Sequence, residues 1–259
     1  MNHPMSRLPV AIVSAMHEEL HALLAVMRER QSVRLAGRDF HQGLIHGRPV
    51  VLVLSGIGKV AATTTAVLLM HEFNARQLVF TGVAGGLRRG VKVGDVVVAR
   101  QLLHHDMDAS PLFPRFEVPL TGRAYFDTSA SLADALAGAA QRCLDQVDRL
   151  IDPALLAGFG IDAALLHQGL VISGDSFVAS EAQSQALRSV LPEALAVEME
   201  GAAVAQACAD FARPFAVIRT ISDRADANAH VDFTRFIDAV ASTYTRAIIE
   251  DWLRNDSHG

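Results

Sequence analysis

Apolar runs of strand length recur along this chain, and most end in a short segment rich in glycine or acidic residues. The first run, over residues 8–15, is apolar except for Ser14, contains Val and Ile, and is followed by apolar residues at helical spacing over residues 16–30. Unbroken apolar runs are typical of strands buried on both faces, and a strand followed by a helix predicts an α/β fold. Strands are expected on this basis at residues 8–15, 77–83, 94–103, 166–173, 194–197 and 215–221.

Turn and helix signals predict the remaining elements. Residues 40–46 and 49–55 indicate two strands joined at His46-Gly47-Arg48, which is the pattern of a hairpin. Ser180 is a suitable N-cap for a helix over residues 180–191. Further helices are expected at residues 60–73, 131–150, 201–209 and 232–253.

The segment over residues 106–127 differs from its surroundings. Pro111, Pro114, Pro119 and Gly122 interrupt it, so we do not expect it to form a regular element. A loop of this length is uncommon in a compact domain and indicates a role in function or at an interface.

Composition limits the class of protein. With 51% hydrophobic and 20% charged residues among 259, the chain can bury a large core, and we expect one domain over residues 1–259.

A net charge of −5 without a basic cluster argues against nucleic acid as a partner. No apolar run approaches the roughly 18 residues of a membrane span, so no membrane partner is expected. Cys143 and Cys208 lack metal-ligand spacing, which favours free thiols in a soluble cytoplasmic protein.

The segments that follow the strands are the expected location of a ligand, because open α/β sheets bind ligands beyond the carboxyl ends of their strands. None of these segments matches a phosphate-binding P-loop, a dinucleotide fingerprint, or the common zinc and serine hydrolase motifs. His104-His105-Asp106 could suggest a metal, but adjacent residues on a strand point to opposite faces, which favours a structural role. No metal site is predicted.

Glu198-Met199-Glu200 stands between an apolar strand and a helix of small residues. Carboxylates are rarely buried unless they are paired, yet acidic residues also favour a helix N-terminus, so this pair is either a cap or a site. Glu200 forms a set of three with Glu19 and Asp223, which also follow strands. Carboxylates in different environments can divide the roles of acid and base, so the set predicts acid–base catalysis.

Seven short motifs extend over nearly the whole chain, at residues 15–19, 55–62, 81–86, 93–97, 173–177, 197–200 and 221–223. In sequence and order they resemble those of 5′-methylthioadenosine/S-adenosylhomocysteine nucleosidases, in the purine nucleoside phosphorylase superfamily. The resemblance implies a single α/β/α sandwich with a central mixed β-sheet. It also implies a homodimer that binds a small adenine nucleoside and uses no cofactor and no metal.

The resemblance further implies hydrolysis of the N-glycosidic bond, with release of adenine and a 5′-thioribose. Asp223, oriented by Ser222, would protonate the purine N7, Glu19 would activate water, and Glu200 would bind the ribose hydroxyls. These residue types suit the chemistry, because an oxocarbenium-like transition state needs an acid at the leaving base and a base behind the water. The resemblance implies further contacts, with Met199 at the sugar, Phe177 and Val178 at the adenine, Arg219 at the water, Ile57 and Phe233 at the 5′ side, and Val83, Ala84 and Gly85 in the pocket. Glu198 would have a secondary or structural role.

Two alternatives remain open, a phosphate-dependent purine nucleoside phosphorylase of the same superfamily and a nucleoside-binding protein without catalysis. Phosphate recognition favours Arg and fixed donors. Residues 81–86 contain no Arg, and Glu19 would repel a phosphate, so the sequence favours water as the nucleophile.

The chain departs from the family pattern in two places. Val83 stands where the nucleosidases commonly have Ser near the water and the sugar. The segment over residues 106–127 also differs from the usual pattern. The resemblance implies that this loop shapes the pocket for the 5′ substituent, in family dimers with help from the partner subunit.

Overall fold

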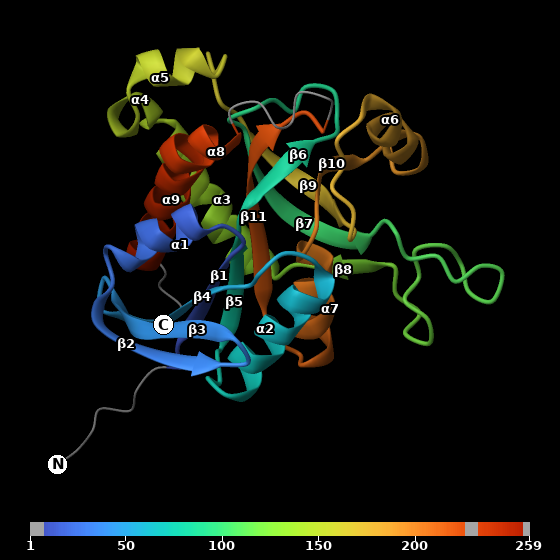
Figure 1. Cartoon of the computed structure of the whole chain (residues 1–259), viewed down its shortest axis with the longest axis horizontal. Coiled ribbons are helices and arrows are strands. Elements are labelled where there is room, and N and C mark those ends of the chain that lie inside the picture. Colours follow the sequence, from blue (N-terminus) through green and yellow to red (C-terminus); the bar gives the residue numbers. More distant parts are fainter. Residues whose placement is uncertain (1–7, 226–232, 256–259) are drawn as a thin grey trace.

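The computed structural model describes residues 8–225 and 233–255, and these form an 11-stranded mixed sheet. The strand order is β2-β3-β4-β1-β5-β11-β6-β10-β9-β7-β8 (Figure 1). The strands are β1 (Val10–Ser14), β2 (Arg28–Leu35), β3 (Arg38–Ile45), β4 (Arg48–Leu54), β5 (Gln77–Thr81), β6 (Val83–Gly86), β7 (Val96–His104), β8 (Tyr125–Asp127), β9 (Leu166–Ser173), β10 (Ala194–Glu198) and β11 (Phe215–Asp223).

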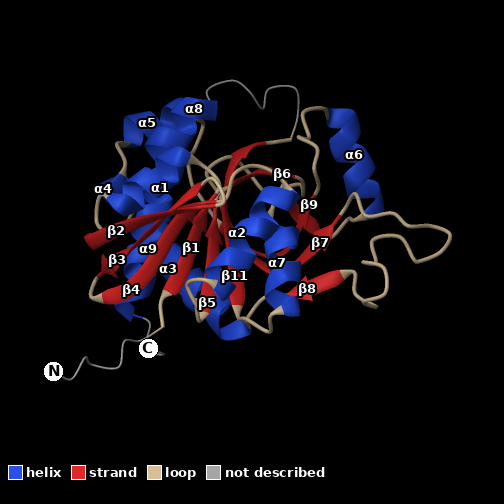
Figure 2. Ribbon diagram, turned by 60° about the horizontal axis from the view of Figure 1, so that its bottom comes forward, coloured by secondary structure: helices blue, strands red, loops and turns tan. Residues whose placement is uncertain are grey.

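Helices cover both faces of this sheet (Figure 2). In β1, Val10 and Ile12 pack into one core with one set of helices, while Ala11 and Val13 pack into a second core with the other set. This alternation confirms the predicted α/β/α sandwich with a central mixed sheet. The first set includes α1 (His17–Leu24), α3 (Ala130–Leu144) and α9 (Ser242–Asn255), and the second includes α2 (Lys59–His71) and α7 (Gly201–Asp210).

Strand β11 connects the two parts of the sheet. Its beginning pairs in parallel with β5 and its end with β6, while its middle pairs antiparallel with β7. Because β6, β10, β9 and β7 also pair in succession, these strands and β11 close into a small ring. Gly85 of β6 is the register partner of Asp223 on one side and of Val197 on the other. The ends of β10 and β11 therefore meet across β6.

The prediction of a helix over residues 16–30 is wrong for the second half of that range. Helix α1 ends at Leu24, and the chain then enters β2. Strand β2 lies at the edge of the sheet, pairs with β3, and is exposed along almost its whole length. An exposed edge strand has no buried face to impose an apolar alternation, and charged residues there protect the edge from further pairing.

Four other features of the fold also differ from the prediction. Residues 84–86, expected as a loop, belong to β6, and the expected helix over 131–150 is divided into α3 and α4 (Val147–Leu150). A short helix, α5 (Pro153–Gly158), was not predicted. The closing helix is interrupted, since a π-helical turn, η1 (Ile237–Ala241), joins α8 (Phe233–Phe236) to α9.

The two predicted turn features are confirmed. His46 and Gly47, at φ 49° and 73°, form the tight turn between β3 and β4. The Ser180 hydroxyl accepts a hydrogen bond from the Gln183 main-chain N–H at 3.3 Å and caps α6 (Glu181–Val190). Cys143 and Cys208 are buried free thiols, as expected.

The segment over residues 106–127, called the Pro-rich segment below, projects from the body of the molecule before the chain returns in β8 (Figure 1). The expectation that residues 106–127 form no regular element is therefore wrong for β8. Leu112 and Leu120 in this segment are 84% and 90% exposed. None of the described helices has the length and apolar character needed to cross a membrane.

Candidate active site

A cavity of about 320 Å³ lies where β6, β10 and β11 meet. This volume is at the lower end of the range for small-molecule pockets, roughly 300 to 1,000 Å³. Most of the residues predicted from the sequence line it. They are Ile57, Val83, Ala84, Gly85, Phe177, Val178, Glu198, Met199, Glu200, Ser222 and Asp223.

Asp223 ends β11 and is buried with its carboxylate held at both oxygens. The Ser222 hydroxyl donates to Oδ2 at 2.8 Å, and the Ala225 main-chain N–H donates to Oδ1 at 2.7 Å. A Cβ atom at Gly85 would lie 2.9 Å from Asp223 Oδ1, so only glycine leaves room for this carboxylate. The side chain therefore has one fixed orientation at the cavity wall.

Glu198 ends β10 and is occupied by the surrounding protein. Arg219 donates to its Oε2 at 2.6 Å, and the Gly201 N–H donates to both oxygens at 2.9 and 2.8 Å. The Ser173 hydroxyl also donates to this carboxylate. The Arg219 guanidinium lies over the Phe80 ring, 4.1 Å from its centroid. Glu198 thus neutralises a buried arginine and is held in one position at the cavity wall.

Glu200 immediately precedes α7 and faces the same cavity. The Gly58 N–H, at the beginning of α2, donates to Glu200 Oε1 at 2.8 Å. Gly58 adopts a φ of 91°, a conformation that favours glycine. Burial, together with the negative charge of Glu198, raises the pKa of Glu200 above its usual range. The hydrogen bond from the Gly58 N–H and the positive charge of Arg219 partly offset that rise in the pKa of Glu200.

Glu19 lies in α1 and is completely buried. The Thr245 hydroxyl, from α9, donates to Glu19 Oε1 at 2.9 Å, whereas Oε2 has no hydrogen-bond partner among the described residues. Burial raises the pKa of Glu19 from its ordinary value of 4.5 to about 7, while the Thr245 hydrogen bond and the Arg219 charge act in the opposite direction. The main chain of Met16, which lines the cavity, also acts to lower the pKa of Glu19.

Three predicted residues are not part of the cavity lining. Glu19 and Arg219 lie behind it, close enough that the Arg219 charge lowers the pKa values of both Glu19 and Glu200. Phe233 begins α8, but its side chain lies outside the described part of the structure.

Sequence reasoning missed several residues near the site. Ala15, Met16, Ser176 and Val197 line the cavity, and all four lie within motifs already singled out. Thr245 is different, because 226 residues separate it from Glu19 and nothing in the closing helix marks it.

The rim of the cavity is partly open and is tied to the Pro-rich segment. Ile57 is 69% exposed and Phe177 is 44% exposed. Lys59 Nζ lies 2.7 Å from Asp106 Oδ1, and the Asp175 N–H donates to Asp106 Oδ2 at 2.9 Å. The Pro-rich segment therefore begins at the edge of the cavity.

The histidines at the end of β7 have structural contacts. His104 Nε2 lies 3.2 Å from Gln206 Oε1, and the His105 ring packs so closely on Gly174 that a Cβ atom there would be 2.4 Å from it. Within the described residues, no group of three His, Cys, Asp or Glu side chains could hold a metal ion.

Comparison with known proteins agrees with this arrangement. The family model described as Phosphorylase superfamily matches residues 9–254. A 5′-methylthioadenosine/S-adenosylhomocysteine nucleosidase from Geobacillus thermodenitrificans is 37% identical over 233 residues, which are 89% of this chain and 90% of that protein. The crystal structure of such a nucleosidase from Neisseria meningitidis, in complex with methylthio-immucillin-A, is 34% identical with a TM-score of 0.83, covering 96% of this chain and 99% of that one.

The structural relatives also include a futalosine hydrolase mutant of Helicobacter pylori, at 32% identity and a TM-score of 0.80, covering 96% of this chain and 99% of that one. The shared fold therefore occurs with more than one named substrate. The family match and the nucleosidase relatives extend over nearly the full length. The chain belongs to the 5′-methylthioadenosine/S-adenosylhomocysteine nucleosidase family of the phosphorylase superfamily.

Proposed function

We propose that the protein hydrolyses the N-glycosidic bond of 5′-methylthioadenosine and S-adenosylhomocysteine, releasing adenine and the 5′-thioribose. One observation carries this proposal. Two carboxylates, Asp223 and Glu200, face one cavity, and a third, Glu19, is fully buried in the helix that begins just after the cavity residue Met16. Glycosidic cleavage needs this equipment, namely an acid for the leaving group and a base for the nucleophile.

On the base side, Asp223 is the general acid that protonates adenine at N7. Adenine leaves poorly as an anion, so protonation of its ring lowers the barrier to cleavage. The hydrogen bonds from Ser222 and the Ala225 N–H fix the carboxyl group for this transfer. Phe177 stacks on the adenine, and the main chain of Val178 pairs with its edge.

On the sugar side, Glu200 accepts hydrogen bonds from the ribose hydroxyls while Met199 packs against the ring. The Gly58 N–H holds one oxygen of Glu200 and so aligns the carboxylate. The nearby negative charge also stabilises the positive charge that develops on the sugar in the transition state.

Glu19 is the base that takes a proton from the attacking water. A pKa of about 7 is suited to this role, because a base with a pKa near the working pH is both available and strong enough. Arg219 supports the water site through its charge, which favours the ionised form of Glu19.

The charge distribution favours water over phosphate as the nucleophile. No Arg or Lys lines the described part of the cavity, and the nearby Arg219 is already paired with Glu198. We expect adenine release from 5′-methylthioadenosine at full rate in phosphate-free buffer, measured by chromatography of adenine and of the sugar product. Adenine release that requires phosphate and yields a sugar 1-phosphate would instead identify a phosphorylase.

The Thr245→Val variant is expected to shift the pH dependence of hydrolysis. The Thr245 hydroxyl donates to Glu19 and favours the charged form, so its loss raises the pKa of Glu19 further. The rising limb of kcat/KM against pH should move upward by up to about one pH unit, because a hydrogen bond to a charged carboxylate is stronger than one to a neutral carboxyl group by roughly 1 kcal/mol. Thr243→Val is the matched control, because the Thr243 hydroxyl bonds to the Ala239 carbonyl on the same helix. Identical profiles for both variants would show that Thr245 does not tune Glu19.

A further inference from the structure

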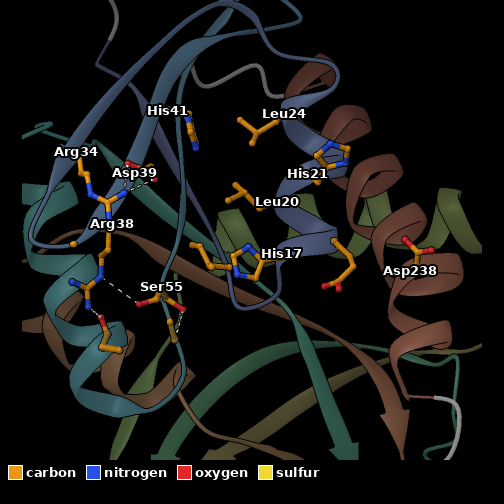
Figure 3. A pocket seen from close by; sticks show the side chains of 15 residues that line it. His17, Leu20, His21, Leu24, Arg34, Arg38, Asp39, His41, Ser55 and Asp238 are labelled. Atoms are coloured by element: carbon orange, nitrogen blue, oxygen red, sulfur yellow. Dashed lines mark hydrogen bonds and ion pairs between the residues drawn. The ribbon is translucent and has the colours of Figure 1, made fainter.

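Two helices flank the strands that carry the nucleoside cavity, α1 on one side of β6 and α6 on the other (Figure 1). Beside α1 the structure is open, since a hollow of about 830 Å³ lies between this helix, the β2–β3 hairpin and the beginning of α2 (Figure 3). Asp223, the proposed general acid, does not line this hollow. On the other side, α6 contacts the segment that directly follows β11 and the acid.

The contact of α6 with that segment is made by a buried serine. Ser184 is 0% exposed and is the one buried residue among the ten of α6. Serine inside a helix can donate back to a carbonyl of the same helix, as Ser189 of α6 does to Ala186 at 2.7 Å. The Ser184 hydroxyl instead donates to the main-chain carbonyl of Ala225, 41 residues further along the chain. Because a hydroxyl has one proton to donate, the donor at this buried position is committed to Ala225.

Ala225 has a backbone conformation that needs such support. Its φ of 51° lies in the left-handed region, which is unfavourable for a residue with a Cβ atom and persists where surrounding contacts fix it. The residue is fully buried, and a Cβ atom added at Gly85 would lie 2.9 Å from the Ala225 Cβ. Its carbonyl accepts from Ser184, while its N–H donates to Asp223 Oδ1 at 2.7 Å. Ala225 therefore connects α6 to the carboxylate of the acid.

The same helix begins directly after the segment that the proposed function assigns to adenine. Phe177 and Val178 line the cavity, and Ser180 caps α6 two residues later. Val178 and Ala225 also belong to one apolar cluster, and Leu187 of α6 packs against this cluster. One helix therefore links the segment proposed to bind adenine with the segment that holds the acid.

We infer that Ser184 is a positioning residue for the general acid, acting through Ala225 to hold the Asp223 carboxyl group in the orientation that reaches the purine ring. Proton transfer requires the acid to lie within hydrogen-bond distance of the ring nitrogen, so a small rotation of the carboxyl group slows the reaction. This inference rests on the proposed function and deepens it, because it names a residue outside the cavity lining that sets the geometry of proton transfer.

The test is a double-mutant cycle between Ser184 and Asp223, measured as kcat for adenine release from 5′-methylthioadenosine. Ser184→Ala leaves the Ala225 carbonyl without its donor and is expected to lower kcat by roughly 5-fold, the effect of one hydrogen bond. In the Asp223→Asn background no acid remains to be positioned, so the same change should lower the residual rate by no more than about 2-fold. Ser189→Ala is the matched control, because its hydroxyl bonds within α6, and it should leave the rate unchanged in both backgrounds.

An equal loss in both backgrounds would show that Ser184 supports the whole site rather than the acid, and no loss beside an intact Asp223 would show that Ala225 keeps its conformation without it. Either result would overturn the inference while the proposed function stands. If Ser184→Ala does not fold, Ser184→Cys takes its place in the cycle, because a thiol is a much weaker donor. If the unaltered protein released no adenine from 5′-methylthioadenosine, the proposed function would fail, and the inference with it.

Discussion

Replacing Asp223 with Asn is expected to reduce adenine release from 5′-methylthioadenosine by on the order of 100-fold or more, the range for loss of a general acid. Asn has nearly the same shape, and its amide oxygen can still accept the hydrogen bond from the Ala225 N–H. It cannot transfer a proton to the purine ring. Substrate affinity, measured by calorimetry on the inactive variant, should therefore change by no more than a few-fold.

A substrate with a better leaving group separates acid catalysis from a structural role. A p-nitrophenyl 5-methylthioribofuranoside expels a stable anion and does not need protonation of its leaving group. Asp223→Asn should hydrolyse this compound at nearly the wild-type rate. Ser222→Ala, which retains the acid and removes its orienting hydroxyl, should show a smaller loss with 5′-methylthioadenosine. Equal loss by Asp223→Asn with both substrates would remove Asp223 from the role of acid.

The Glu19→Gln variant is expected to have two opposite effects, a large loss of activity and a gain of stability. Hydrolysis should fall by on the order of 100-fold, since Gln cannot accept a proton from water. The stability effect comes from burial. The folded protein holds the proton of Glu19 with a pKa of about 7, against 4.5 for the ordinary carboxyl group.

The sign of the stability effect follows from proton binding. Below pH 4.5 the carboxyl group is protonated in both states, and its titration contributes nothing to the free energy of unfolding. Between pH 4.5 and about 7 only the unfolded chain releases the proton, so stability falls as the pH rises. Above pH 7 the full difference has been lost, about 3 kcal/mol for a shift of this size.

Glu19→Gln avoids this loss because its amide stays neutral, and Thr245 can still donate to its oxygen. Urea unfolding should therefore show a variant more stable than the parent by up to about 3 kcal/mol at pH 8 and by much less at pH 4. Glu29→Gln, which removes an exposed carboxylate, should show no such gain. A loss of stability at pH 8 in Glu19→Gln would contradict the raised pKa.

The sequence predicts the central strands well because strands that are buried on both faces consist of continuous apolar residues. Strand β9 lies where its run predicts it, and β1 lies within its run. Strand β2 and the division of β5 from β6 are not predictable in this way. The first has no buried face, and the second is a break in pairing within one apolar stretch. Local patterns record burial, whereas the identity of a strand's neighbour depends on the whole topology.

The catalytic assignments depend on motifs, and most of the residues that line the cavity could be predicted from these motifs. Residues that join from distant elements were not predictable. Thr245 reaches Glu19 from the closing helix. It belongs to no motif, because it is placed by packing between α1 and α9 rather than by local geometry.

The interior and the rim of the site differ in how freely they can change. Glu198 joins β9, α7 and β11 through buried hydrogen bonds to Ser173, Gly201 and Arg219. Loss of any partner leaves a buried charge or donor unsatisfied, which costs several kcal/mol for the ion pair. Ile57 at the rim is exposed and carries no such constraint. Under the proposed function, substitutions of rim side chains would therefore change which 5′ substituent is accepted, while the buried contacts of Glu198 stay as they are.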